Sequence, residues 1–181
     1  MLNSTQAGLR LYAATGFKIV TTLSQHQGVA GAMPPPPASK PMRSMCRDDH
    51  AALIALDAAA TGMPRAAMLM RLLEHAEGVV LECDGAIAGF SLCRRFGRGH
   101  VVGPVVAPDT QGAQLLIAHW LAARPGQFVR VDVPAHATAT SLWLAELGLQ
   151  PAGGGTTMIR GVAPTTTGSS QLFALVSQAT G

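Results

Sequence analysis

Side chains that could take up a proton are few in this sequence, and they lie on or just after predicted strands. His100 and Asp132 fall within apolar, β-branched runs, and His136 follows the end of the second run. An imidazole or a carboxylate in such a place could act as a general base. Each also has an ordinary structural explanation: His100 as a solvated strand-end residue, Asp132 as a hydrogen-bond partner and His136 as a loop residue beside a helix cap. The residue types alone leave both explanations open.

A helix is expected directly after Pro108-Asp109-Thr110, and its first turn could bind an anion. Backbone N–H groups at a helix amino terminus have no partner within the helix and carry the positive end of its dipole, so they bind phosphate groups. The residues that would present these groups are Gln111, Gly112, Ala113 and Gln114. The alternative is that Thr110 simply caps a helix that packs on a sheet.

The strand before this helix could offer free main-chain groups to a ligand. It contains Gly103-Pro104, and because proline has no N–H to donate, pairing with a neighbouring strand could be interrupted there. The residues that would then present their main-chain groups are Val105, Val106 and Ala107.

Neither a disulfide framework nor a metal site is indicated. The chain has three cysteines, Cys46, Cys83 and Cys93, an odd number without CxxC spacing. This usage is typical of free thiols in a reducing compartment. The histidines show no spacing typical of metal ligands, so no metal is expected.

Composition limits the class of protein. Of 181 residues, 48% are hydrophobic and 13% charged, which excludes disorder along the whole chain. Aromatic residues are only 4%, which argues against a stacking surface for nucleic acid. No apolar run reaches the length of about 18 residues that a membrane span needs, and no secretory signal is present. We therefore expect a cytoplasmic protein without a nucleic-acid or membrane partner.

A proline-rich stretch over residues 28–45 is expected to be a linker, because four consecutive prolines favour an extended chain. Before it, residues 1–27 predict a helix capped by Asn3, Ser4 or Thr5 and ended by Gly16, and then a strand over residues 17–23. A lone helix and strand are not stable alone. This segment must therefore pack on the rest of the chain or on another chain.

Residues 46–181 predict most of an α/β domain. Two helices are expected over 47–60 and 64–73, then two strands joined by a tight turn at Asp84-Gly85, and a third strand over 100–107. A helix over 112–124, a strand over 128–134, a helix ended by Gly148, a glycine-rich turn, a strand over 156–161 and a last strand within 171–181 follow. This order indicates a mixed, mostly antiparallel twisted sheet flanked by helices.

One short pattern occurs twice. Residues 11–17 (LYAATGF) align with residues 143–149 (WLAELGL), and each is the end of a predicted helix followed by a strand. The first copy matches position by position the Leu-Tyr-x-x-x-Gly-Phe signature that closes the last helix in the GNAT superfamily of acyl-CoA-dependent N-acetyltransferases. With the order of elements, it makes the chain resemble that superfamily.

The resemblance is closer to two-domain members whose second half is a divergent GNAT unit. The residues that carry it are Asp57, Gly62 and Arg65, the strand over 85–90 and the run over 103–107. It implies that residues 46–181 form a GNAT-like domain and that residues 1–27 are the tail of a first such domain. A separate expectation comes from the lone helix and strand of residues 1–27, which could pack on the body of a second chain and so make a homodimer that exchanges this segment.

The resemblance also implies an activity: transfer of an acetyl group from acetyl-CoA, as cosubstrate, to an amine of a small molecule or peptide by direct attack. The pantetheine arm would pair with Val105–Ala107 and the pyrophosphate would lie on the helix that starts at Gln111. The family's acid is the tyrosine of the Leu-Tyr pair, which is Tyr12 in the N-terminal segment, whereas Leu144 holds that position in the body. The bases would be His100, Asp132 or His136.

Two departures from the family favour a different function. The family's loop reads Arg/Gln-x-x-Gly-x-Gly/Ala, but here Gln111 is followed at once by Gly112 and Ala113. Leu144 cannot donate a proton. The alternative is therefore a non-catalytic GNAT-like module that binds a ligand or forms a dimer.

Overall fold

The computed structural model describes residues 1–32 and 41–179. Most of the proline-rich stretch expected as a linker, residues 33–40, lies outside the described residues. Its flanks belong to strands, since one strand continues to Val29 and another begins at Met42. None of the described helices is long and apolar enough to cross a membrane.

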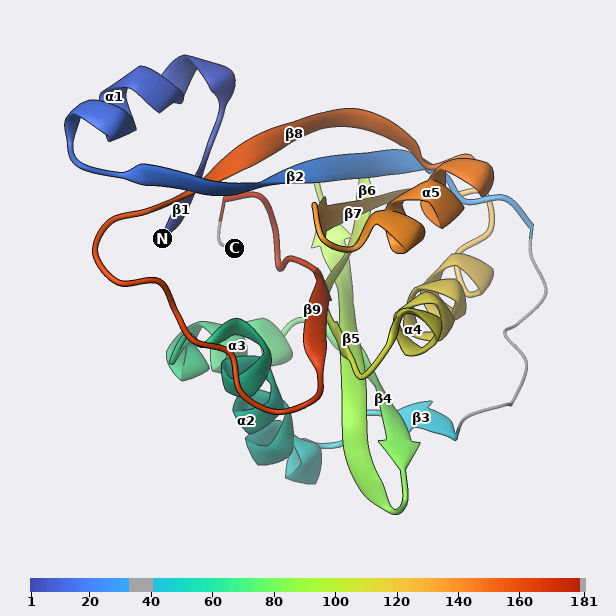
Figure 1. The fold of residues 1–181 in the computed structure, drawn as a ribbon. Coiled ribbons are helices and arrows are strands. Elements are labelled where there is room, and N and C mark those ends of the chain that lie inside the picture. The colour runs from blue at the N-terminus through green and yellow to red at the C-terminus, as the bar shows by residue number, and fades with distance from the viewer. Residues whose placement is uncertain (33–40, 180–181) are drawn as a thin grey trace.

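The described chain alternates helices and strands (Figure 1). The strands are β1 (Leu2–Ser4), β2 (Lys18–Val29), β3 (Met42–Ser44), β4 (Glu77–Cys83), β5 (Ala86–Phe96), β6 (Gly99–Ala107), β7 (Phe128–Pro134), β8 (Gln150–Ile159) and β9 (Gln171–Ala174). The helices are η1 (Gln6–Gly8), α1 (Leu9–Ala14), η2 (Arg47–Asp49), α2 (His50–Thr61), α3 (Ala66–Leu73), α4 (Thr110–Ala122) and α5 (Thr138–Glu146).

All the described strands belong to one mixed sheet, as the sequence predicts. Its order is β1-β8-β2-β7-β6-β5-β4-β3, and β9 pairs with β6 outside that path. Only β6 and β7 run parallel; the other described pairs are antiparallel. The N-terminal segment packs on the body of the chain, because β2 lies between β7 and β8 and pairs with both.

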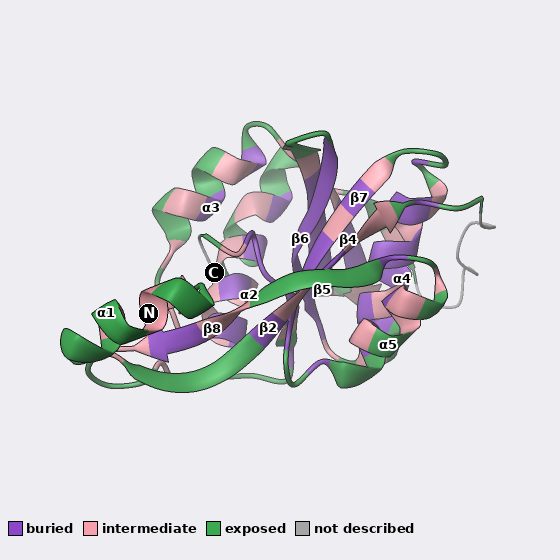
Figure 2. Ribbon diagram, turned by 90° about the horizontal axis from the view of Figure 1, so that it is seen from above, coloured by how far each residue is buried: buried purple, intermediate pink, exposed green. Residues whose placement is uncertain are grey.

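Helices cover both faces of the sheet, and each face has its own core. On one side α4 and α5 bury Leu116, Trp120 and Leu144 against the sheet. On the other side α2 and α3 bury Leu53 and Leu69 among a second group of apolar side chains. Figure 2 shows that the buried residues run through the middle of the sheet, whereas α1 has none.

The tight turn predicted at Asp84-Gly85 is confirmed. Asp84 and Gly85 have φ values of 52° and 76°, and Cys83 and Ala86 pair on either side of them. A two-residue hairpin of this type needs positive φ at both central residues, which aspartate and glycine tolerate. The turn fixes the register between β4 and β5.

Two local expectations are wrong. Asn3 and Ser4 do not cap a helix, because they form the short strand β1, and no side chain caps η1 at Thr5. The glycine-rich turn expected before residue 156 is part of β8, which begins at Gln150. Pairing with β2 holds these glycines in an extended strand, and a Cβ on Gly154 would lie 2.4 Å from the carbonyl oxygen of Leu23.

Candidate active site

The parallel strands β6 and β7 separate along their length. They pair only at His100 with Val129 and at Val101 with Arg130. Beyond Val101 the main chain of β6 is no longer paired with β7, although it stays paired with β5 on its other edge. This divergence is the feature that the sequence leads us to expect near Gly103-Pro104.

The space between the diverging strands is filled by β9. The positions of β6 that pair with it are Val105, Val106 and Ala107. Just beyond β9, the Leu175 N–H donates to the Asp132 carbonyl oxygen on β7 at 2.8 Å. Gly103 permits this close approach, since a Cβ there would lie 1.9 Å from the Leu175 carbonyl oxygen. The C-terminal segment, from β9 to Gln178, therefore contacts both β6 and β7 and closes the groove between these two strands.

The amino terminus of α4 carries a carboxylate of its own. Asp109 is the N-cap, and its Oδ1 accepts a hydrogen bond from the Gly112 N–H at 2.6 Å. The capping residue is thus Asp109 rather than Thr110. Because the carboxylate is negative and already takes one of the first N–H groups, it opposes a phosphate at the same place.

The other expected anion-binding residues offer little. Ala113 and Gly112 are buried, Gln111 is exposed and Gln114 is half-buried. A Cβ on Gly112 would lie 3.0 Å from Leu81. As described, the groove does not fit an acyl-CoA: its main-chain groups are paired with β9 and its helix terminus is capped by Asp109.

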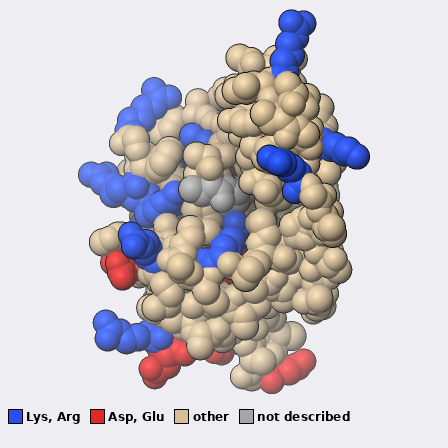
Figure 3. All heavy atoms as spheres, turned by 90° about the vertical axis from the view of Figure 1, so that its left-hand side faces the viewer, with Lys and Arg blue, Asp and Glu red and all other residues tan. Residues whose placement is uncertain are grey.

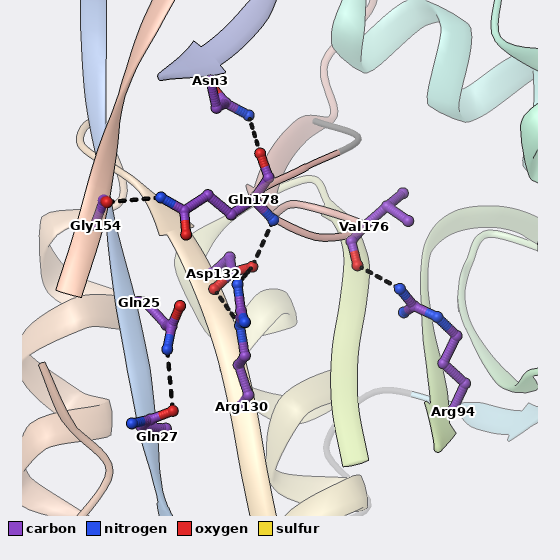
Figure 4. A network of polar contacts seen from close by, with 9 residues as sticks. All are labelled: Asn3, Gln25, Gln27, Arg94, Arg130, Asp132, Gly154, Val176 and Gln178. Atoms are coloured by element: carbon purple, nitrogen blue, oxygen red, sulfur yellow. Dashed lines mark hydrogen bonds and ion pairs between the residues drawn. The ribbon is translucent and has the colours of Figure 1, made fainter. Parts of the chain in front are cut away.

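The candidate bases occupy three separate environments. His100 is 8% exposed at the start of β6, and burial, followed by the positive charges of Arg124 and Arg95, lowers its pKa. Asp132 is fully buried and is held by two hydrogen bonds of 2.8 Å from Arg130. Its carboxylate also accepts the Gln178 N–H at 2.7 Å (Figure 4). Asp132 is therefore engaged in fixing the C-terminal segment.

His136 lies closest to β9. It is exposed, and its Nε2 is 2.9 Å from the Leu172 carbonyl oxygen. Since a carbonyl only accepts, Nε2 carries the proton and Nδ1 holds the lone pair in the neutral ring. Tyr12 lies on α1, where its ring packs edge-on against Phe17.

A cavity of about 410 Å³ lies beside β9. It is lined by the ends of α2 and β7, by β1, β2 and β8, and by the segment around β9; its polar lining residues include Asn3, Thr61, His136, Thr157, Ser170 and Gln171. No Asp, Glu, Lys or Arg is among the described lining residues. Of the four candidate catalytic residues, only His136 lines this cavity.

Sequence reasoning missed this cavity and the residues that hold the C-terminal segment. The Gln178 carbonyl oxygen accepts a hydrogen bond from Asn3 Nδ2 at 3.0 Å (Figure 4). The side chain of Gln178 donates through Nε2 to the Gly154 carbonyl oxygen at 2.6 Å. Arg94 donates to the Val176 carbonyl oxygen at 3.1 Å. These partners come from segments far apart in the chain, so no local pattern indicates them.

The thiols do not form a reactive centre. Cys46 and Cys83 are exposed, and burial raises the pKa of the Cys93 thiol to about 11. A thiol with a raised pKa is a poor nucleophile at neutral pH.

On the face shown in Figure 3, basic side chains are scattered over a largely uncharged surface.

Comparison with known proteins identifies the kind of domain. The family model described as "Acetyltransferase (GNAT) domain" matches residues 53–174, from within α2 to the last residue of β9. The chain is 26% identical over 149 residues to the "Uncharacterized N-acetyltransferase YitH" of Bacillus subtilis, which covers 81% of this chain and 52% of that protein. It thus spans about half the length of this curated relative.

Solved structures share the fold. An acetyltransferase structure from Pyrococcus horikoshii superposes with a TM-score of 0.72 at 16% identity, covering 99% of this chain and 59% of that one. A GCN5-related N-acetyltransferase from Sphaerobacter thermophilus gives a TM-score of 0.57 at 18% identity, covering 92% and 61%. At these identities the likeness concerns the fold alone.

Proposed function

This protein belongs to the GNAT family of acetyltransferases. We propose that it takes part in acetyl-CoA-dependent transfer of an acetyl group to an amine as a ligand-binding module, and that it does not itself bind the acetyl-CoA. One observation carries the proposal. The main chain of Val105–Ala107, which the family resemblance assigns to the cofactor, is paired with β9. A ligand that needs these groups must first displace β9.

The surrounding residues support a non-catalytic role. Leu144, at the position of the family's acid, is fully buried and cannot donate a proton. The Asp132 carboxylate already accepts hydrogen bonds from Arg130 and from the Gln178 N–H. His100 lies where β6 and β7 are still paired, at the narrow end of the groove between them. No acid–base pair is assembled among these residues.

The cavity beside β9 is the proposed ligand site. About 410 Å³ is within the range of small-molecule pockets. Because its described lining has no ionisable side chain other than His136, an uncharged ligand loses less hydration free energy on entering than an ion does. We expect a neutral amide such as hexanamide to raise the melting temperature more than hexanoate or hexylammonium does.

A second candidate function is catalysis by this chain itself, with acetyl-CoA as cosubstrate and a small-molecule or peptide amine as acceptor. The observation that favours it is the bond between His136 Nε2 and the Leu172 carbonyl oxygen. Departure of β9 would release His136 and the Val105–Ala107 main chain together. His136 would then be the base, and the Val106 N–H would face the developing oxyanion.

Calorimetric titration with acetyl-CoA separates the two functions. The proteins are the unaltered chain, Phe173→Ala, which weakens the anchor of β9, and Val162→Ala as the control, since Val162 is 95% exposed. The module predicts no heat with any of them. Micromolar binding, about −8 kcal/mol, by the unaltered chain or by Phe173→Ala would overturn the module in favour of catalysis.

Turnover is measured on the same proteins with a panel of amines. Released CoA is separated by chromatography, because the exposed thiols of Cys46 and Cys83 would react with thiol reagents. The module predicts no release above the protein-free rate. Amine-dependent release that rises in Phe173→Ala would establish the second candidate.

A further inference from the structure

Two arginines from different strands lie close together, next to the C-terminal segment. Arg94 is on β5 and Arg130 is on β7, and their Cζ atoms lie 5.5 Å and 5.4 Å from the ring centre of Phe96. Figure 4 shows both side chains beside Asp132 and the C-terminal segment. The two guanidinium groups therefore share one aromatic side chain and one acid.

The charges of this group do not cancel. Asp132 is fully buried and accepts two hydrogen bonds of 2.8 Å from Arg130. Arg94 forms no ion pair with a described residue, and its Nη2 donates to the neutral Val176 carbonyl oxygen at 3.1 Å. Because arginine stays protonated in proteins, the group carries one positive charge in excess.

Arg94 itself is poorly compensated. Its Nη1 is buried and has no hydrogen-bond partner among the described residues. Burial, and to a smaller extent the positive charge of Arg130, lowers the pKa of Arg94. A negative charge placed close by would favour the charged form of this guanidinium, because the attraction between charges is strong where little water screens it.

A cavity of about 320 Å³ lies beside the two arginines. It is lined by Asn3 and Thr5, by Phe96 and Arg130, and by residues 177–179, and no acid is among its described lining residues. It shares only Asn3 with the described lining of the cavity beside β9, so the two cavities are distinct. Its volume is at the lower end of the range of small-molecule pockets.

Two hydrogen-bond donors of this second cavity have no partner among the described residues. Arg130 uses Nε and Nη2 for Asp132, which leaves its Nη1. The Thr5 side chain caps no helix, and its hydroxyl binds no described residue. Phe96, which is 42% exposed, adds an aromatic surface. A carboxylate could accept hydrogen bonds from both donors while a flat apolar group attached to it packs against Phe96.

We propose that the second cavity binds a small monocarboxylate with a flat apolar part, such as an aromatic acid. Arg130 and Thr5 would contact the carboxylate, and Arg94 would act on it through its charge. One excess positive charge matches a monoanion better than a phosphate dianion. This site goes beyond the proposed function, whose ligand is neutral and lies in the cavity beside β9.

Titration with benzoate, followed by NMR of the backbone amides, tests the proposal. Benzamide has the same shape without the charge, and phenyl phosphate carries more negative charge. We expect millimolar binding of benzoate, with shift changes at Thr5, Ser177 and Ala179, and binding of the other two probes that is at least fivefold weaker. No change with benzoate, or changes confined to the cavity beside β9, would overturn the proposal. Binding of benzamide as tight as that of benzoate, or tighter binding of phenyl phosphate, would overturn the assignment to a carboxylate.

A matched pair of variants isolates the charge of Arg94. Arg94→Gln and Arg95→Gln remove the same charge from consecutive residues of β5, whose side chains point to opposite faces of the sheet. We expect Arg94→Gln to weaken benzoate binding at least fivefold and Arg95→Gln to change it less than twofold. Equal effects would show that benzoate responds only to the net charge of the protein, and would overturn the site.

Thr5→Val adds a test that leaves both arginines in place. Thr5 is exposed, so the variant should keep the melting temperature of the unaltered chain. We expect it to weaken benzoate binding about threefold, the loss of one hydrogen bond. Thr167→Val, at an exposed threonine outside both cavities, is the control and should leave the affinity unchanged. An affinity in Thr5→Val equal to that of the control would overturn the placement of the carboxylate beside Thr5.

Discussion

Two strands from opposite ends of the chain insert into the same sheet, and they differ in how firmly they are held. β2 pairs with β7 on one edge and with β8 on the other, and it carries the fully buried His26. β9 pairs with β6 at three positions, and just beyond β9 the Leu175 N–H donates to the Asp132 carbonyl oxygen on β7. The largest buried side chain of β9 is that of Phe173, which is 5% exposed.

The difference separates a permanent part of the fold from a removable one. Loss of β2 would expose two strand edges and the core under α5, so it should unfold the whole domain. Loss of β9 would expose one groove between strands that already diverge, so it should be a local opening. The removable strand is the one that lies where the family's cofactor would pair.

The largest effect is expected for His26→Ala in β2. The His26 ring is 2.9 Å from the Leu149 carbonyl oxygen and 2.7 Å from Ser141 Oγ, so it joins β2 to the start of β8 and to α5. Removing it leaves a cavity and an unpaired buried carbonyl, at a cost of about 4 kcal/mol in the free energy of unfolding. Urea denaturation measures it, and Gln25→Ala on the same strand is the control. A loss equal to that of the control would contradict a permanent β2.

Asp132→Asn should cost about 3 kcal/mol, because it leaves the guanidinium of Arg130 without its buried partner. It should also speed amide exchange at Gln178, whose N–H binds the carboxylate. Asp48→Asn, at an exposed acid, is the control. Unchanged exchange at Gln178 would mean that Asp132 does not hold the C-terminal segment.

Phe173→Ala tests directly whether β9 is removable. A buried phenylalanine in a rigid core costs about 3 to 5 kcal/mol when truncated. If β9 opens locally, the loss cannot exceed the free energy of that opening, and we expect about 1 to 2 kcal/mol. Leu144→Ala on α5, at a fully buried site, should cost about 3 kcal/mol in the same denaturation experiment. Equal losses would make β9 as permanent as α5.

The smallest effect is expected from acid. Burial and nearby positive charges lower the pKa of His100 in the folded chain, so the unfolded chain binds a proton more readily. The free energy of unfolding is therefore highest above the ordinary histidine pKa of 6.5, and it falls as the pH drops below 6.5 toward the lowered pKa of His100 in the folded chain. The loss between pH 8 and pH 5.5 should be smaller in His100→Gln than in the unaltered chain. A larger loss of stability in His100→Gln would contradict a lowered pKa of His100 in the folded chain.

Local patterns predicted most of the elements but not how the chain ends are placed. Asp84-Gly85, Gly148 and the apolar runs act over a few residues, so the hairpin, the helix ends and the central strands followed from the sequence. The insertion of β2 between β7 and β8 depends on pairing between residues about a hundred or more positions apart, for which no local signal exists. The strand β1 was missed because pairing with β8, not its own propensity, makes it extended.

The candidate site followed the same division. The divergence near Gly103-Pro104 could be expected because proline lacks a donor, and the strands do stop pairing at Val101. The sequence did not predict that residues near the C-terminus fill this opening, because Leu172 and Phe173 indicate only one more apolar strand. The roles assigned to His100, Asp132, His136, Tyr12 and the α4 terminus stay predictions.

Amide exchange along β9, followed by NMR with and without saturating acetyl-CoA, tests the central claim that this strand closes the groove. The account predicts that the N–H groups of Leu172, Ala174 and Leu175 are protected, less strongly than those of Gln25–Gln27, and that acetyl-CoA changes none of them. Loss of protection at Leu175 on adding acetyl-CoA, with new protection at Gly112 and Ala113, would contradict it and show that the cofactor replaces β9.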